Sequence, residues 1–236
     1  MRQNFVLQKW AVWPPLHADR EQELAIQNAL LAKVPALLKR RLTPLAKTVF
    51  CAAHQCLDDS RFVPMVFSSS HGELAKSFGM MERLAAGEEI SPTAFSLSVH
   101  NAIAGLLSMA WGNQQQCTVV APGEEGLAAG FIEALGLLQE GAGRVLLVFY
   151  DEPLVGFYPA APFKLSTAKR CALALGLAKT GDGQAMALSS LPMSGDDGEQ
   201  PVQLETFIRF LVGPQPRLTL KTPRHSWHWE KNVQAD

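Results

Sequence analysis

The chain has 236 residues, of which 47% are apolar and 18% are charged, so it is long enough to bury a large core in one domain. Its formal net charge of −1 gives no overall attraction for nucleic acid or for an anionic membrane surface. No apolar run long enough for a membrane span occurs, and the N-terminus lacks an apolar signal core. The cysteines (Cys51, Cys56, Cys117 and Cys171) lack metal-type spacing, so we expect a cytoplasmic chain with reduced thiols, no metal and no cofactor.

Strand and helix patterns alternate along most of the chain. The first half predicts a strand over 5–12, helices over 21–41 and 45–57 with breaks at Pro35 and Pro44, a strand over 62–67 and a helix over 73–86. There follow a helix over 95–111, expected to be buried nearly all round, a strand over 117–121, a helix over 124–139 and strands over 144–150 and 171–178. This alternation predicts crossover connections and a sheet covered by helices on both faces.

Two segments near the C-terminus lack that alternation. Residues 180–200 are polar and rich in glycine, which predicts a loop. The tail over 214–236 alternates polar and aromatic residues around His225 and Trp229, which predicts a strand or a docking arm. We assign no acid or base role to its histidines.

A short basic cluster, Lys39-Arg40-Arg41, stands near the end of the first predicted helical region. Cations at a helix C-terminus are stabilised by the helix dipole, so a solvated final turn is the simpler interpretation. The same cluster is also able to meet an acidic partner.

The run Ser68-Ser69-Ser70-His71-Gly72 places hydroxyl groups beside an imidazole, as a hydrolase does. Neighbours in sequence rarely reach nucleophile–base geometry, however, and the chain has no Gly-x-Ser-x-Gly motif. A polar turn leading into the next helix is therefore favoured. We interpret His100, which precedes Asn101, as a histidine held by a buried hydrogen bond.

One continuous stretch carries a family resemblance. It opens with Ile90-Ser91-Pro92, continues through Asn101-Ala102-Ile103-Ala104-Gly105 and the turn Trp111-Gly112, and enters a strand that ends at Pro122-Gly123-Glu124-Glu125-Gly126-Leu127. This order resembles that of the β-ketoacyl synthases, the condensing enzymes of fatty-acid synthesis. In that family an Ala-Cys-x-Ser-Gly motif begins the helix of the nucleophile.

The family's nucleophilic cysteine is replaced in this chain. Counting back from Gly126-Leu127 places it on Gly123, and counting forward from Gly112 places it on Glu124. Neither residue can attack a thioester, because covalent catalysis of this kind requires a thiolate. Glu124 and Glu125 are expected to stabilise the start of the following helix, and their charge excludes a phosphate site there.

The resemblance extends over residues 62–152 and implies an α/β, thiolase-like fold. The chain would correspond to the N-terminal half of a ketosynthase, with a mixed five-stranded sheet between helices, in a single domain over 1–236. The second half of such enzymes supplies two catalytic histidines, from Asn-x-His-Gly-Thr and Asn-x-x-Gly-Phe-Gly-Gly loops. Both motifs are absent here.

A ketosynthase half without a nucleophile is not expected to be an enzyme on its own. The chain is similar to chain-length factors, and most closely to the short ketosynthase-like partner subunits of aryl-polyene-type pathways. The resemblance implies a heterodimer in which an active β-ketoacyl synthase elongates an acyl chain held on an acyl carrier protein. This subunit would shape the far end of the acyl tunnel in a polyketide or fatty-acid type of biosynthesis.

The same resemblance suggests which residues line the tunnel or reach the interface. They are His71, Leu74, Phe78, Ala94, Phe95, Ser98 and Val99. Leu74 and Phe78 share a helix face by their spacing, and Phe95 and Val99, one helical turn apart, present one surface towards the tunnel if the segment reaches the interface.

Two other functions remain open at this point. The chain could be a stand-alone acyl-thioester hydrolase or transferase that uses Cys117 or a hydroxyl group of Ser68 to Ser70. It could also be a purely structural subunit that stabilises its partner without contacting the acyl chain.

Overall fold

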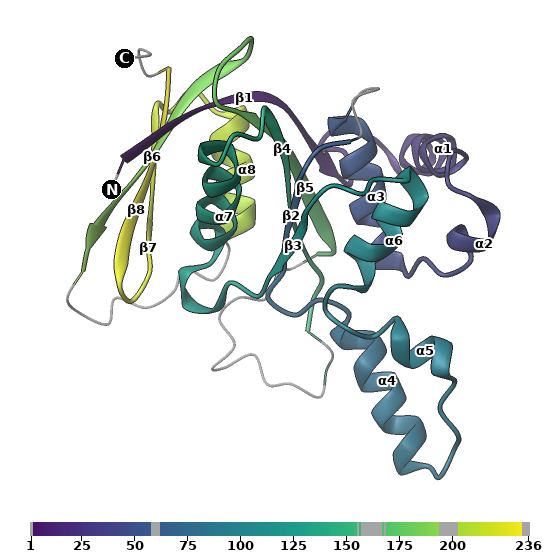
Figure 1. The fold of residues 1–236 in the computed structure, drawn as a ribbon. Helices are drawn as coiled ribbons and strands as arrows, with labels where there is room; N and C mark the ends of the chain where they lie inside the picture. The colour runs from purple at the N-terminus through teal and green to yellow at the C-terminus, as the bar shows by residue number, and fades with distance from the viewer. Residues whose placement is uncertain are drawn as a thin grey trace.

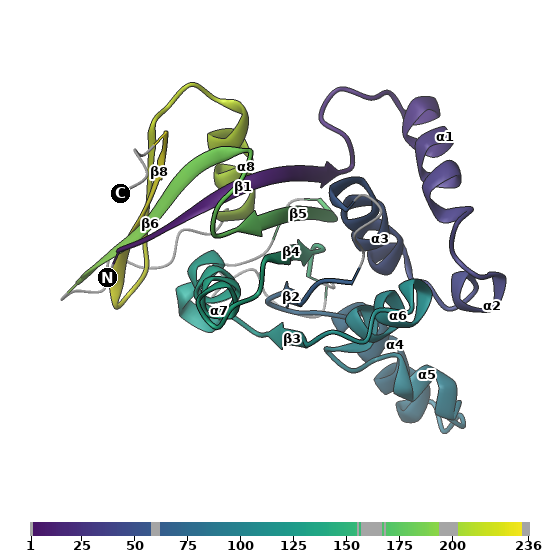
Figure 2. The same ribbon diagram turned by 45° about the horizontal axis from the view of Figure 1, so that its top comes forward.

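The computed structural model describes residues 2–57, 62–154, 156, 167, 169–193 and 203–232. In this part of the chain a single sheet of eight strands runs through the molecule in the order β3-β2-β4-β5-β1-β6-β8-β7 (Figures 1 and 2). β2 pairs in parallel with β3 and β4, and every other neighbouring pair is antiparallel.

The strands are β1 (Arg2–Trp13), β2 (Met65–Ser68), β3 (Cys117–Val120), β4 (Arg144–Asp151), β5 (Cys171–Ala178), β6 (Gln184–Pro192), β7 (Arg217–Lys221) and β8 (His225–Lys231). The helices are α1 (Arg20–Leu31), α2 (Ala36–Lys39), α3 (Pro44–Cys56), α4 (Leu74–Ala85), α5 (Pro92–Ser96), α6 (Ala102–Trp111), α7 (Leu127–Gln139) and α8 (Gln203–Val212), with a 3₁₀ turn, η1, at Gly123–Glu125. None of the helices described is long and apolar enough to cross a membrane.

The thiolase-like fold predicted from the sequence is confirmed, but the sheet has eight strands instead of five. The five predicted strands form its contiguous part, β3-β2-β4-β5-β1. The loop predicted over 180–200 is wrong over 184–192, where β6 pairs with β1 and β8. Residues 194–200 of that predicted loop lie outside the described residues, as do 233–236 at the end of the tail.

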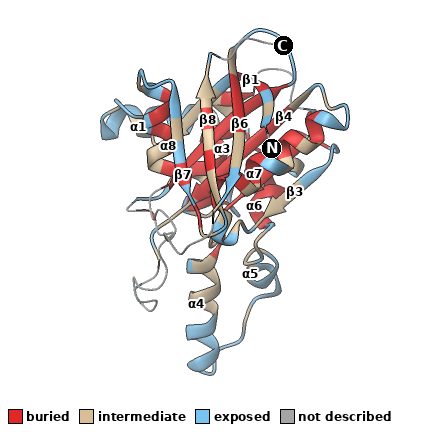
Figure 3. Ribbon diagram, turned by 90° about the vertical axis from the view of Figure 1, so that its left-hand side faces the viewer, coloured by how far each residue is buried: buried red, intermediate tan, exposed pale blue. Residues whose placement is uncertain are grey.

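The C-terminal tail is a strand, which confirms one of its two predicted forms. β8 alternates buried and less buried residues, and Trp227 and Trp229 point into the core. Because the side chains of a strand alternate between its two faces, the polar residues between them lie on the outer face of this part of the sheet (Figure 3).

Two apolar cores cover the two faces of the sheet. α7 and α8 pack on one face around Phe131, and α3 and α6 pack on the other around Phe50. α3 begins at Thr43, whose hydroxyl accepts a hydrogen bond from the backbone of Ala46, with Pro44 in the first turn. The parallel strands β2, β3 and β4 therefore lie between helices, as the crossover pattern predicts.

The long buried helix predicted over 95–111 is wrong. Two helices, α5 and α6, occupy this region, and residues 97–101 form a turn between them. The carbonyl of Phe95 accepts hydrogen bonds from both the hydroxyl and the backbone N–H of Ser98, three residues on, which closes a tight turn in place of the next turn of an α-helix. The chain changes direction there, which leaves Phe95 outside the core.

α4 and α5 form a helical hairpin that projects from the body of the molecule, and we call it the arm (Figure 1). Neither of its helices contains a buried residue. At its root, the carboxylate of Glu73 accepts a hydrogen bond of 2.7 Å from the hydroxyl of Thr43, and the hydroxyl of Ser77 donates to the carbonyl of Ser98. The arm is thus fixed at its base and exposed along its length.

Candidate functional site

The turn between β3 and α7 stands where the resemblance places the catalytic nucleophile, and we call it the elbow. Gly123 has a φ of +54° and carries no side chain, while Glu124 is exposed on η1. A backbone with positive φ favours glycine, so the position fits a tight turn better than a reactive side chain. Neither candidate position therefore offers a nucleophile.

The N-terminus of α7 is capped by a side chain from α8. Oε1 of Gln203 accepts a hydrogen bond of 3.0 Å from the backbone N–H of Leu127, and Gln203 is only 5% exposed. A Cβ atom on Gly126 would lie 2.1 Å from that oxygen, so glycine is required for the side chain to reach the helix. The backbone N–H that could have stabilised an oxyanion here is thus already bonded within the chain.

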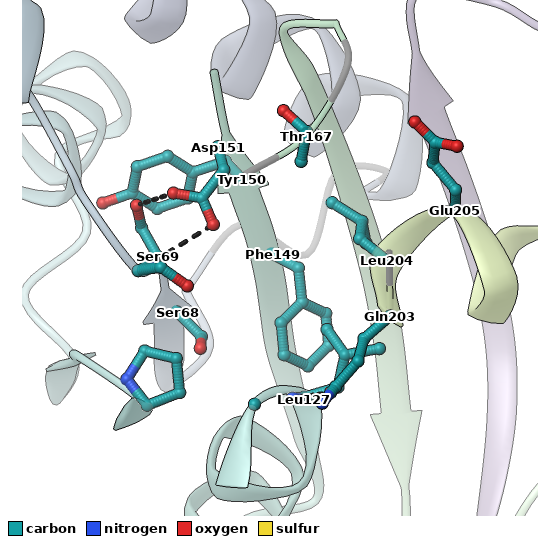
Figure 4. Close-up of a pocket in the computed structure, with 13 residues that line it drawn as sticks. Ser68, Ser69, Leu127, Phe149, Tyr150, Asp151, Thr167, Gln203, Leu204 and Glu205 are labelled. Carbon is teal, nitrogen blue, oxygen red and sulfur yellow. Dashed lines mark hydrogen bonds between the residues drawn. The ribbon is translucent and has the colours of Figure 1, made fainter. Parts of the chain in front are cut away.

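The space left beside the elbow is small. A cavity of about 40 Å³ lies between the end of β2, β4 and the start of α7 and α8, with Gln203 and Leu127 at one side (Figure 4). A water molecule needs about 10–15 Å³ by the same kind of measure, so the cavity holds a few waters and no acyl chain.

Asp151, at the end of β4, organises the serine–histidine turn. Its carboxylate accepts a hydrogen bond from the hydroxyl of Ser69 at 2.8 Å (Figure 4). It also accepts from the backbone N–H groups of Ser70 and His71. Burial raises the pKa of Asp151, although these hydrogen bonds oppose the effect. The sequence analysis did not single out this residue, because a strand-ending aspartate before Glu152-Pro153 is typical of an ordinary turn.

The serine–histidine turn does not assemble a hydrolase site. The hydroxyl of Ser69 also accepts a hydrogen bond of 2.7 Å from the backbone N–H of Gly72. Its O–H donor and its oxygen acceptor are therefore both used to hold the turn together. Nε2 of His100 is 2.9 Å from the carbonyl oxygen of Ser69 and not from its hydroxyl, which agrees with the predicted structural role of this histidine. No hydrogen bond joins a serine hydroxyl to a histidine ring among the described residues.

Cys117, the nearest thiol, begins β3 at the edge of the sheet and is separated from the elbow by the whole strand. Cys117 is exposed as a residue, but desolvation of its thiol beside α6 raises its pKa, and a hydrogen bond with Ser108 only partly opposes this. A raised pKa disfavours the thiolate, which is the reactive form. No group of three or more potential metal ligands occurs among the described residues.

Glu125, which follows the two candidate positions of the nucleophile, ties the elbow to the C-terminal hairpin of β7 and β8. The carboxylate of Glu125 accepts hydrogen bonds from Nε1 of Trp227 at 2.7 Å and from the hydroxyl of Thr222 at 3.0 Å, and it lies 3.3 Å from Nδ1 of His225. Burial by itself raises the pKa of Glu125, but the hydrogen bonds from Trp227, His225 and Thr222 outweigh it and lower the pKa below its usual value. Glu125 is therefore a structural anchor as well as a charge near the start of α7.

Replacing Glu125 by glutamine should lower the free energy of unfolding by about 1–2 kcal/mol at neutral pH, because an amide cannot accept all of these hydrogen bonds. The folded-state pKa lies below that of the unfolded chain, near 4.5. The contribution of the charge is therefore fully present above that value and is lost as the pH falls through the folded-state pKa. Urea denaturation at several pH values should show that the difference in free energy of unfolding between variant and wild type becomes smaller as the pH is lowered.

Glu124→Gln is the matched control, since it makes the same substitution at an exposed neighbour. Its effect should stay within about 0.5 kcal/mol at every pH. Equal effects of the two variants would contradict the anchoring role of Glu125.

The residues expected to line a tunnel lie in two places. Leu74, Phe78, Ala94 and Phe95 belong to the arm, and Ser98 and Val99 follow it in the turn before α6. His71 lies at the root of the arm, where its Nε2 atom is buried and unbonded within the described part of the chain. Phe95 and Val99 do not share a helix, because α5 ends at Ser96.

A groove of about 450 Å³ runs beside the arm, between α6 and the edge strand β3. It is lined by His100, Asn101, Ala104, Gly105, Ser108, Cys117 and Val119. The small residues of α6 leave this space open, and the sequence analysis did not detect it because it interpreted α6 as fully buried.

These features define a ketosynthase-like fold whose elbow carries no nucleophile. Residues 10–230 match the family model described as the β-ketoacyl synthase N-terminal domain, so the chain belongs to that family. No curated protein matches the chain.

Solved structures support the same fold. The complex of the ketosynthase ApeO with its chain length factor ApeC from Xenorhabdus doucetiae contains a chain that matches with a TM-score of 0.76 and 24% identity, covering 96% of this chain and 99% of that one. The ishigamide ketosynthase/chain length factor matches with a TM-score of 0.57 and 14% identity, covering 82% of this chain and 68% of that one. A β-ketoacyl synthase from Burkholderia phymatum matches with a TM-score of 0.53 and 12% identity, covering 76% of this chain and 60% of that one. At these identities the likeness establishes the fold.

Proposed function

We propose that this chain is a chain-length factor, a non-catalytic subunit that pairs with an active β-ketoacyl synthase and shapes its acyl tunnel. The reaction of the complex would be the elongation of an acyl chain on an acyl carrier protein, in a polyene or fatty-acid type of pathway. The observation that carries the proposal is the joint presence of an elbow without a nucleophile and an arm without a buried residue.

The arm supports a partner because several of its apolar side chains are exposed to solvent. Phe95 is 62% exposed, and Val99, Met81 and Leu84 are exposed as well. Apolar side chains gathered on a projecting element of this kind mark interaction surfaces. The resemblance gives the same segment a role at the interface with a ketosynthase.

The sheet edge next to the arm supports the same partner. β3 ends the sheet with Cys117-Thr118-Val119-Val120, none of which is charged. β7, at the opposite edge, carries Arg217 and Lys221. Because charged side chains protect a sheet edge from pairing, the unprotected β3 edge is suited to an interface, and the opposite edge is not.

The coverage of the solved structures gives further support. This chain covers 99% of the matched chain in the Xenorhabdus doucetiae complex of a ketosynthase with its chain length factor. It covers 60% of the Burkholderia phymatum synthase.

Co-expression with the ketosynthase encoded beside it should give a heterodimer that survives size-exclusion chromatography. Produced alone, the chain should aggregate or self-associate, because the arm and the β3 edge stay uncovered. Phe95→Asp should abolish co-purification by placing a charge in the interface, whereas Leu191→Asp should not. Both positions are 62% exposed, but Leu191 lies on β6, away from the arm.

A well-behaved monomer that ignores every ketosynthase encoded nearby would overturn the proposal. The catalytic role is checked separately by incubating the isolated chain with acyl thioesters and malonyl carrier protein. Intact mass spectrometry should show no acyl adduct. A stoichiometric adduct on Cys117 or on a serine of the turn over 68–70 would instead establish a hydrolase or transferase.

A further inference from the structure

The N-terminus of α7 is closed by an amide group that belongs to another helix. Gly126, at the N-cap position of α7, has no side chain with which to cap it. Gln203, the first residue of α8, supplies the missing acceptor through its Oε1 atom, which takes the hydrogen bond of the Leu127 N–H. Its side chain lies beside Leu127 at the start of α7 (Figure 4). A neutral carbonyl oxygen is thus the group that this helix end holds in the folded chain.

Only one end of the amide is used. The Nε2 atom of Gln203 is buried and has no hydrogen-bond partner within the described part of the chain. An unpaired N–H2 group at a position that is 5% exposed is costly, and an apolar side chain of similar size would avoid that cost. The role of the amide here is therefore to supply its carbonyl oxygen.

The surroundings fix the position of this amide. Leu204 and Phe207, which follow Gln203 on α8, are buried in the core and anchor the start of that helix. On the other side the amide lies against the backbone of Gly126, where any Cβ atom would clash with it. The space at the helix end therefore has the shape of one carbonyl group, with the cavity of about 40 Å³ beside it.

The charges around this cavity select the kind of group that can lie there. A helix N-terminus by itself attracts anions. The same cavity is also lined by the carboxylates of Asp151 and Glu205, which would repel a further negative charge. A neutral carbonyl compound therefore suits the site better than a carboxylate or a phosphate does.

We infer that the N-terminus of α7 is a binding site for a neutral carbonyl group, of the chemical class of small amides, and that the chain fills this site with its own Gln203 side chain. The side chain acts as an internal ligand and keeps other carbonyl groups out, that of an acyl thioester included. The inference goes beyond the proposed function, because closure of the elbow by Gln203 is a separate change from replacement of the nucleophile. Removal of the side chain should open a site that a free amide can enter.

Hydrogen exchange of the Leu127 amide, followed by mass spectrometry of overlapping peptides, tests the inference in the full chain or in its complex with the ketosynthase. Exchange should be slow in the wild type and at least about tenfold faster in Gln203→Gly, because the N–H group loses its acceptor. Propionamide has the same heavy atoms as the missing side chain, so about 0.1 M of it should restore slow exchange in this variant. It should leave the wild type unchanged. Propionate should not restore slow exchange, because Asp151 and Glu205 line the cavity.

Gln203→Met is the matched control, since methionine fills the space of glutamine but offers only a weak acceptor. Its Leu127 amide should exchange as fast as in Gln203→Gly, and propionamide should have no effect because the site is filled. Circular dichroism checks that each variant is folded. If Gln203→Gly does not fold, Gln203→Ala with acetamide makes the same test with a smaller truncation.

Slow exchange in Gln203→Met, or fast exchange in the wild type, would show that the carbonyl group of Gln203 does not hold the helix end, and would overturn the inference. Exchange that neither propionamide in Gln203→Gly nor acetamide in Gln203→Ala slows would overturn it as well, and so would equal slowing by propionate. Pairing with a ketosynthase does not enter the result, because exchange at Leu127 reports on the elbow alone.

Discussion

Replacing Phe131 by alanine should lower the free energy of unfolding by about 3–5 kcal/mol, the range for truncating a buried phenylalanine. Phe131 is 1% exposed in the middle of α7. Its ring centroid lies 5.4 to 5.9 Å from four other aromatic rings, those of Phe5, Phe149, Phe207 and Trp229. These rings come from β1, β4, α8 and β8, so one side chain joins the elbow helix α7 to the central sheet and to the C-terminal extension, by which we mean α8, β7 and β8. Truncation leaves a cavity that four rigid rings cannot easily fill.

Urea denaturation followed by circular dichroism measures this effect. Ile132→Ala, at the next position of the same helix, is the matched control, because Ile132 is largely exposed and its loss should cost less than about 1 kcal/mol. A loss below about 1.5 kcal/mol for Phe131→Ala would mean that the aromatic cluster does not hold the extension in place.

The sequence predicted the five strands of the ketosynthase-like half because each is a short apolar run between clear turn residues, as in 144–150. It did not predict β6, since the segment 184–192 contains no β-branched or aromatic residue, the types that favour strands. β6 is stabilised by pairing with β1 and β8. Stabilisation by strands that are distant in the chain does not show as a local sequence pattern. The break between α5 and α6 was missed for a related reason, because Ser98 ends the helical turn through a side-chain bond that composition does not reveal.

The loss of the nucleophile is the part of the candidate site that could be predicted from the sequence. The lack of a cysteine at Gly123 or Glu124 is readable in the sequence once the resemblance is recognised. The cap that closes the elbow was not predictable, because Gln203 and Leu127 are 76 positions apart in the chain. Asp151 is likewise 82 positions from Ser69. Contacts over such separations depend on the fold, and no local spacing encodes them.

Control of product length is the second large effect that we expect. Phe95→Ala or Phe78→Ala, made in the ketosynthase complex, should shift the products to longer chains by at least one two-carbon unit. One methylene in an apolar pocket is worth about 1–3 kcal/mol, so a wall that clashes with two more carbons stops elongation, and a wall that has lost a phenyl ring does not. Complex formation should be largely preserved, because truncation removes contact area without introducing a charge.

The structure changes the physical basis of this prediction. Phe95 lies at the end of α5 and Val99 in the turn beyond it, so they do not form one helix face as the sequence suggested. Leu74 and Phe78 are one turn apart on α4 and keep their predicted common face. An exposed Phe95 can act as a wall only when a partner encloses it, so the effect should be absent in any assay of this chain alone.

Mass analysis of the products decides the question, with Leu191→Ala as the control for loss of an exposed apolar side chain and Phe131→Ala as the control for lost stability. Neither control should lengthen the product, because neither residue lies on the arm. If both tunnel variants assemble and still give products of unchanged length, the wall lies elsewhere or the subunit only stabilises its partner. If Phe131→Ala also lengthens the product, loosening of the subunit rather than removal of a wall accounts for the change.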